Sequence, residues 1–329
     1  ISMIFNLIKS RQPNSFVLFP LLVVALWLPA FLSEPEHTFT NLMPLYELFV
    51  SVVGGSGKLA LIIGVLLVVA EGLLLNRIID THKILPERNN LVAFFYILFS
   101  SIHTSFLYAN PVLLANLFII LALGQLLTVY NQKSVLKEVF NASVLISIAS
   151  LFYFPSILMI LLIWATFIII RPLEWRNYIL SLLGPLLVGI WLASYYFLTD
   201  QLPVLSDKYL EFNNYFEGLT ISGFSYVVIG FLIIIALVAF GSLLKGLSKN
   251  TVRVKNLLRV VSFFFLFSLL TFLLTNQDYF STYAFVLVSF AIYTANYFDY
   301  LKRYWIGNSL IILLIVFVLY NNYRLIGLF

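Results

Sequence analysis

The sequence predicts an all-α protein that crosses a membrane many times. Of its 329 residues, 62% are hydrophobic and only 10% are charged, whereas soluble domains carry about 25% charged residues. Apolar runs of about 17–25 residues, long enough to cross a ~30 Å hydrocarbon layer, recur along the chain. The basic residues gather in the short segments between these runs. We therefore expect one integral membrane domain over residues 1–329, without a soluble domain.

The apolar runs predict eleven membrane spans. They are expected at about 15–32, 59–76, 90–108, 111–130, 140–153, 156–170, 177–198, 224–244, 256–275, 279–298 and 305–321. Pro155, which follows three aromatic residues, divides the apolar run 140–170. This favours a tight hairpin of two short spans. The alternative, a single kinked span over 140–170, would invert every downstream segment.

The distribution of charge decides between these two readings and orients the chain. With a cytoplasmic N-terminus and eleven spans, sixteen of the nineteen lysines and arginines lie on the inner side, and only Lys58, Lys208 and Arg324 lie outside. This agrees with the positive-inside rule. Fusing 140–170 into one span would place the basic segment Lys245–Arg259 outside. The basic residues lie in short inter-span segments, so the net charge of +5 does not indicate nucleic-acid binding.

Two predicted outer segments, 31–58 and 199–223, are longer than simple turns. In the first, Thr40 and Asn41 could cap a short helix over Leu42–Val53 that ends at the glycines following it. Its apolar residues recur at helical spacing, which predicts a helix lying in the membrane interface. The second segment mixes charged and aromatic residues, a composition that favours an interfacial re-entry over a free loop.

Glu71 is the ionisable residue that lies well inside a predicted span. An unpaired carboxylate at that depth costs a few kcal/mol, so Glu71 should be paired, protonated or exposed to a polar cavity. It could serve as a proton or ion relay, or be a packing carboxyl bonded to a neighbouring helix. Because the sequence offers no second buried acid or base to exchange a proton with, the packing interpretation is favoured.

The densest polar cluster outside the membrane is Glu34, Glu36 and His37. Two carboxylates two residues apart could supply a general base or hold a divalent cation, or could be solvated charges at the end of a span. His37 and His103 both fall on the outer side, but two histidines on separate segments do not predict a metal site. The chain has no cysteine and no nucleotide-binding, zincin or hydrolase motif. We predict no metal and no cofactor.

The stretch Asn110–Phe197 combines short out–in–out spans, a turn marked by Pro155, an Arg171–Pro172 inner segment and a long span containing Gly184–Pro185. With the cytoplasmic N-terminus, an acidic first outer loop and an interfacial helix, this arrangement resembles the GT-C class of polyprenyl-phosphate-dependent glycosyltransferases. The whole chain also resembles a poorly characterised family of bacterial inner-membrane proteins. That resemblance implies a multi-pass protein of the bacterial inner membrane.

The GT-C resemblance implies a catalytic carboxylate in the first outer loop, and Glu34 and Glu36 match that place. The class more often has aspartate there, and this loop contains none. The class also needs outer cations for the lipid phosphate, and Lys58 and Lys208 are available.

His37 and His103, on the same side, complete the set of candidate substrate-binding residues. The resemblance thus predicts an enzyme that handles lipid-linked sugars or another isoprenoid phosphate at the outer leaflet. Two alternatives stay open: a non-catalytic subunit bound to other envelope membrane proteins, and a secondary transporter that uses Glu71. In each case membrane lipids are expected partners.

Overall fold

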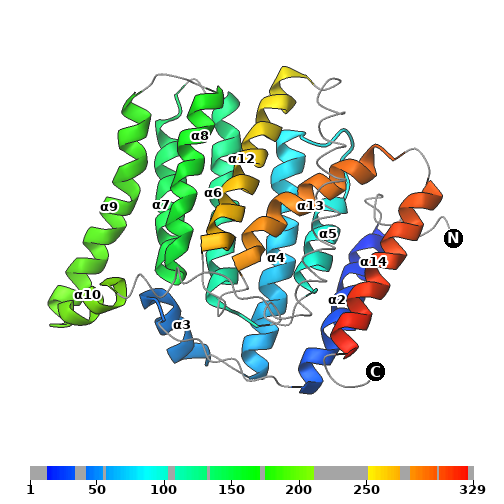
Figure 1. The fold of residues 1–329 in the computed structure, drawn as a ribbon, viewed down its shortest axis with the longest axis horizontal. Coiled ribbons are helices and arrows are strands. Elements are labelled where there is room, and N and C mark those ends of the chain that lie inside the picture. The colour runs from blue at the N-terminus through cyan, green and yellow to red at the C-terminus, as the bar shows by residue number, and fades with distance from the viewer. Residues whose placement is uncertain are drawn as a thin grey trace.

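The structure is a computed structural model, and it describes the nine ranges that follow. They are residues 13–33, 42–54, 57–102, 108–131, 134–170, 175–210, 251–274, 282–301 and 304–324. Throughout these ranges every regular element is a helix (Figure 1). The expected span 224–244 lies outside them.

Among the described residues, four helices are long and apolar enough to cross a membrane. They are α4 (Lys58–His82), α6 (Pro111–Thr128), α9 (Trp175–Leu198) and α12 (Val252–Leu274). These apolar helices are consistent with an integral membrane protein. The count of eleven spans and the GT-C-like arrangement stay predictions.

The first helices end where their sequences favour a break. After α2 (Pro13–Ser33), the helix expected over Leu42–Val53 is present as α3 (Pro44–Val53). It starts at Pro44, which suits the first helical position, and ends at Gly54, whose φ of 86° favours glycine. The expected cap at Thr40–Asn41 lies outside the described residues.

The prediction for the third span was wrong in its length. The expected helix over 90–108 is present as α5 (Leu91–Ser100), which has ten residues. The Ser100 hydroxyl bonds the Tyr96 carbonyl at 2.8 Å and the Ser101 hydroxyl bonds the Ile97 carbonyl at 2.7 Å. Such side-chain bonds to the backbone weaken the regular helix. All ten residues of α5 are buried, so this helix is enclosed by the others.

Of the following helices, α7 (Leu136–Phe152) packs between α6 and α9, and α8 (Ile160–Ile170) packs on α12 (Figure 1). The Asn110 side chain caps α6 by accepting a 2.7 Å bond from the Leu113 backbone N–H. Between α7 and α8 the chain turns at Tyr153, which is extended, and continues through the short 3-10 helix η3 (Phe154–Met159). The break predicted from Pro155 is therefore confirmed.

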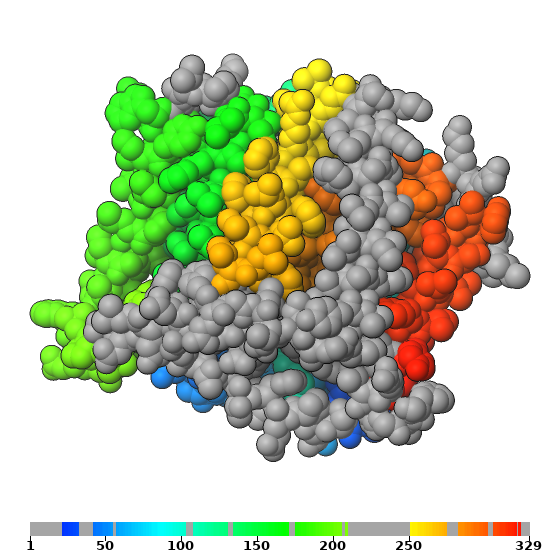
Figure 2. Space-filling model, viewed as in Figure 1, coloured from blue at the N-terminus to red at the C-terminus, as the bar shows by residue number. Residues whose placement is uncertain are grey.

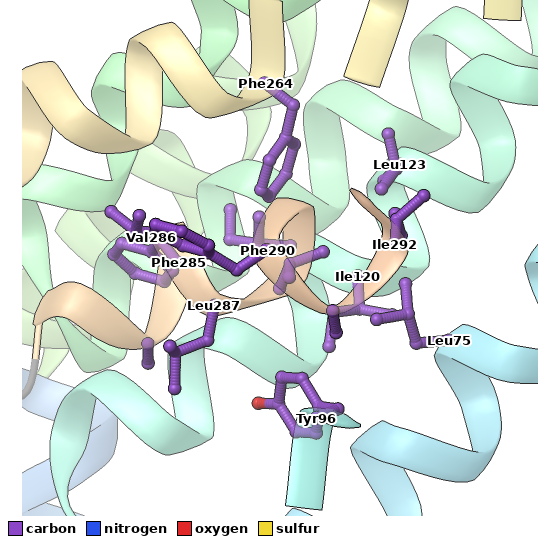
Figure 3. Packing of buried hydrophobic residues seen from close by; sticks show 14 of the residues in the cluster. Leu75, Tyr96, Ile120, Leu123, Phe264, Phe285, Val286, Leu287, Phe290 and Ile292 are labelled. Carbon is purple, nitrogen blue, oxygen red and sulfur yellow. The ribbon is translucent and has the colours of Figure 1, made fainter. Parts of the chain in front are cut away.

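The helix α10 (Leu202–Leu210) follows α9, and α13 (Tyr283–Asp299) and α14 (Tyr304–Arg324) complete the described chain. Nearly every residue of α13 is buried. Figure 3 shows Phe285, Phe290 and Ile292 of α13 surrounded by side chains from α4, α5, α6 and α12. The rings of Phe95 on α5 and Phe298 on α13 pack with centroids 4.8 Å apart. The core therefore lies around the contact between α5 and α13.

One electrostatic contact relates the basic segment before α12 to the end of α4. His82 at the end of α4 interacts electrostatically with Arg253 at the start of α12. This places the described part of the basic segment Lys245–Arg259 at the same end as the α4–α5 connection. In Figure 1 α3 and α10 lie at the opposite end. We call the end with α3 and α10 the outer end, following the charge prediction.

Candidate functional site

At the outer end, α3 and α10 are joined across 161 residues of sequence. Lys208 on α10 donates a hydrogen bond to Glu47 on α3 and forms an ion pair with it. The Lys208 side chain is 20% exposed and that of Glu47 is 55% exposed. The next residue, Tyr209, packs edge-on against Phe154 of η3, with ring centroids 5.1 Å apart. We call α3, α10 and the turn at Tyr153–Phe154 the outer platform.

Tyr46 bonds the outer platform to the bundle, and Tyr209 packs within the platform. The Tyr46 hydroxyl on α3 donates to the Ala109 carbonyl, just before α6, at 3.3 Å. Burial raises the pKa of Tyr46 above its ordinary value. Burial, and to a smaller extent the neighbouring Tyr196, raise the pKa of Tyr209 to about 12. Both hydroxyls are therefore neutral at ordinary pH, and the charges of the described platform come from its lysine and carboxylates.

An open apolar groove of about 480 Å³ lies where α9 meets α10. It is lined by Ala193, Ser194, Phe197, Leu198 and Leu202. The groove lies at the outer end of the bundle, because α10 belongs to the outer platform. In Figure 2 α9 and α10 form one margin of the molecule.

The structure places two of the six outer residues proposed from the sequence. Lys58 is the exposed first residue of α4, and Lys208 is held by Glu47. The other four, Glu34, Glu36, His37 and His103, lie outside the described residues. Sequence reasoning missed Glu47 as a site residue, although its place on the polar face of a predicted amphipathic helix was a usable signal.

Inside the bundle, Glu71 is fully buried and bonded to two other helices. The Tyr96 hydroxyl on α5 donates to Glu71 Oε2. The Asn116 amide on α6 lies 3.2 Å from the same oxygen and 2.8 Å from the Tyr96 hydroxyl. We call these three side chains the buried cluster. It contains the partners that a carboxyl at this depth requires.

The position of the buried cluster follows from how closely α4 and α5 pack. Gly72 lies beside Glu71, and a Cβ added there would be 3.3 Å from the Ala93 carbonyl and from the Tyr96 ring. This close approach brings Tyr96 to the carboxyl. Because α4 continues to His82 rather than ending near residue 76, Glu71 is about 20 Å from one helix end and about 17 Å from the other. It is therefore close to the middle of α4.

Two acceptor atoms of the buried cluster have no hydrogen-bond partner among the described residues, Glu71 Oε1 and Asn116 Oδ1. Buried polar atoms are nearly always paired, so each unpaired atom needs an explanation. Tyr283 at the start of α13 is near enough to Tyr96 to interact with it electrostatically. Within the described ranges, no three His, Asp or Glu side chains gather closely enough to hold a metal ion.

Comparison with protein families matches residues 58–329 to a family model described as a family of unknown function, DUF6427. The chain belongs to the DUF6427 family. No curated protein and no solved structure matches it. The DUF6427 match includes the whole buried cluster, Lys208 and the groove between α9 and α10. It starts after α3, so Glu47 and the first outer loop precede it.

Proposed function

We propose that this DUF6427 protein is a multi-pass protein of the bacterial inner membrane that binds a lipid-linked phosphate at the outer leaflet. The carrying observation is the outer platform, where an apolar groove reaches Leu202, the first residue of α10, and the same helix carries Lys208. The groove would hold the isoprenoid chain, and Lys208 would hold the phosphate. This proposal supports the enzyme reading, in which Glu34 or Glu36 in the first outer loop serves as the base.

The Glu47–Lys208 pair is suited to opening for a phosphate. A partly exposed ion pair contributes only about 0–1 kcal/mol, because water screens both charges. A phosphate carries more charge than a carboxylate and presents more acceptor oxygens, so it competes with Glu47 for Lys208. Glu47 is the more exposed partner and can turn to solvent once displaced.

The phosphate, rather than the hydrocarbon tail, should determine affinity. In a bilayer the tail leaves one apolar environment for another, so filling the groove yields little net free energy. A hydrogen bond to a charged group contributes about 1.5–3 kcal/mol. We therefore expect polyprenyl phosphate to bind at least about tenfold more tightly than the corresponding polyprenol, which has the same tail without the charge.

The test measures binding of polyprenyl phosphate and of polyprenol to the full chain in nanodiscs. Lys208→Gln should weaken phosphate binding, whereas Glu47→Gln should strengthen it by freeing the lysine. Lys255→Gln, on α12 at the inner end, is the matched control and should leave binding unchanged. Equal binding of the two lipids, or the same response from both platform variants, would refute the proposal.

A second measurement separates the enzyme reading from the subunit reading. Glu34→Gln combined with Glu36→Gln should abolish glycan transfer from the bound lipid without reducing lipid binding. If other membrane proteins purify with the chain at fixed stoichiometry and no lipid is retained, the subunit reading is correct instead.

A further inference from the structure

The Glu71 carboxyl of the buried cluster has no positively charged partner among the described residues, and the proposed function does not involve it. Glu71 Oε2 already accepts bonds from Tyr96 and Asn116, and no basic side chain among the described residues pairs with the carboxyl. An ionised carboxylate at this depth costs several kcal/mol when no positive charge accompanies it. The titratable groups that face it, across the described helices packed on α4, are Tyr96 and, beyond it, Tyr283.

The two unpaired oxygens, Glu71 Oε1 and Asn116 Oδ1, indicate that a proton is the positive charge that suits the cluster. A proton on Glu71 Oε1 neutralises the carboxyl and turns that oxygen into a donor. Asn116 Oδ1 is an acceptor without a partner, on a side chain already bonded to the same carboxyl. Protonation thus supplies both a donor and a charge, and the cluster holds an acceptor to receive it.

Other hydroxyl-bearing side chains, at the start of α13 and at the turn before η3, lie on the outer side of the buried cluster. Tyr96 is electrostatically close to Tyr283, and the adjacent Thr282 lies 3.1 Å, hydroxyl to hydroxyl, from Tyr153 at the outer turn. Toward the inner end, the next polar side chain of α4 is Asn76, about 7.5 Å along the axis. Its amide is bonded at 2.9 Å to the Asn89 carbonyl in the α4–α5 connection.

We propose that the buried cluster is a reversible proton-binding site, with the proton held on Glu71 and exchanged with the outer face. The exchange route consists of the hydroxyls of Tyr96, Tyr283, Thr282 and Tyr153. To protonate the carboxylate, Tyr96 gives its hydroxyl proton to Glu71 Oε2, the oxygen that it bonds, and receives another from the outer side, which water at the surface supplies. A half-turn of the carboxyl group then exchanges the positions of its two oxygens. Release is the reverse, so protons and charge balance at each transfer. The proton site does not use the Glu47–Lys208 pair or the groove, although its route ends at Tyr153 in the outer platform.

Infrared difference spectroscopy of the full chain tests the proton site. The carbonyl band of a protonated carboxylic acid should gain intensity as pH falls, should be lost in Glu71→Gln, and should persist in Glu87→Gln, which removes an exposed acid. Tyr96→Phe should shift the band, because the carboxyl loses a donor. Glutamine matches the shape of glutamate, and size-exclusion profiles check the fold of each variant.

Three outcomes would overturn the proposal. A Glu71 band that stays constant at every pH at which the protein is folded would mean a permanent structural proton. A band that disappears when Na⁺ is added at fixed pH would mean a sodium site. A band that persists in Glu71→Gln would mean that the band belongs to another carboxyl.

The direction of exchange is tested in liposomes that contain the protein in one orientation. After an acid pulse on the outer side, the Glu71 band should rise more slowly in Tyr153→Phe and in Thr282→Val than in the wild type. Asn76→Leu, on the inner side, should leave the rate unchanged. The opposite pattern would place the entry at the inner end and overturn the proposed route.

Discussion

Replacing Gly64 by alanine should destabilise the protein, although alanine is the better helix former. A Cβ at Gly64 would be 2.8 Å from the Tyr108 carbonyl carbon and 3.0 Å from the Ala109 nitrogen. Both are backbone atoms, so relief requires the 108–110 segment to move away from α4. That segment is bonded to α4 by the Ala109 N–H and the Ala60 carbonyl, 3.1 Å apart.

The magnitude follows from three contributions. Overpacking at a tight contact costs about 1–3 kcal/mol. A displacement of about 0.6 Å, which would restore ordinary contact, lengthens the Ala60–Ala109 bond beyond hydrogen-bonding range and loses about 1 kcal/mol. The higher helix propensity of alanine returns about 1 kcal/mol. The net destabilisation is therefore about 1–3 kcal/mol, which lowers the melting temperature by roughly 2–6 °C.

Gly189→Ala is the matched control, because nothing lies within 4 Å of a Cβ at that position of α9. It should be neutral or stabilising by up to about 1 kcal/mol. The assay is thermal unfolding of both variants in the same detergent. If Gly64→Ala melts at or above Gly189→Ala, the close contact between α4 and the 108–110 segment is refuted.

Two further predictions concern single side chains. The pKa of the Tyr209 hydroxyl is raised to about 12, so the stability that its neutral form contributes should be intact below the ordinary pKa near 10. That stability should fall as pH rises from about 10 to about 12, because only the unfolded chain then loses the proton. Tyr209→Phe should flatten this part of the curve of stability against pH, and an unchanged curve would contradict the burial of Tyr209. Trp27→Phe should lower the free energy of unfolding by about 1 kcal/mol, since it removes the 2.9 Å bond from the Trp27 indole to the Ser101 hydroxyl. If the same substitution lowers the free energy of unfolding equally in a Ser101→Ala background, this bond contributes nothing.

The sequence was sufficient for features set by local chemistry. Pro155 predicted the turn between α7 and α8, and the glycines after Val53 predicted the end of α3, because both residue types act through the backbone at their own position. The sequence failed for α5, where an apolar run of span length became a ten-residue helix. Hydropathy measures whether a segment tolerates an apolar environment, and not how far its helix continues.

The sites depended on pairings that local patterns do not contain. The sequence placed Glu71 inside a span but could not find Tyr96 and Asn116, which come from two other helices. It placed Lys208 on the outer side but could not pair it with Glu47, 161 residues earlier. An aromatic and an amide within apolar runs look like ordinary packing residues until the helices are assembled.

The enclosure of α5 has a consequence for biosynthesis. A ten-residue helix is too short to settle across a bilayer alone, and its principal neighbour α13 begins about 180 residues later. At translation rates of about 5–20 residues per second, α5 must wait about 10–40 s for that neighbour to emerge. During this interval the aromatic side chains of α5 must be covered by the insertion machinery or by lipid. Chains released from ribosomes that stall before Tyr283 would lack α13, and α5 would then lack its principal packing partner.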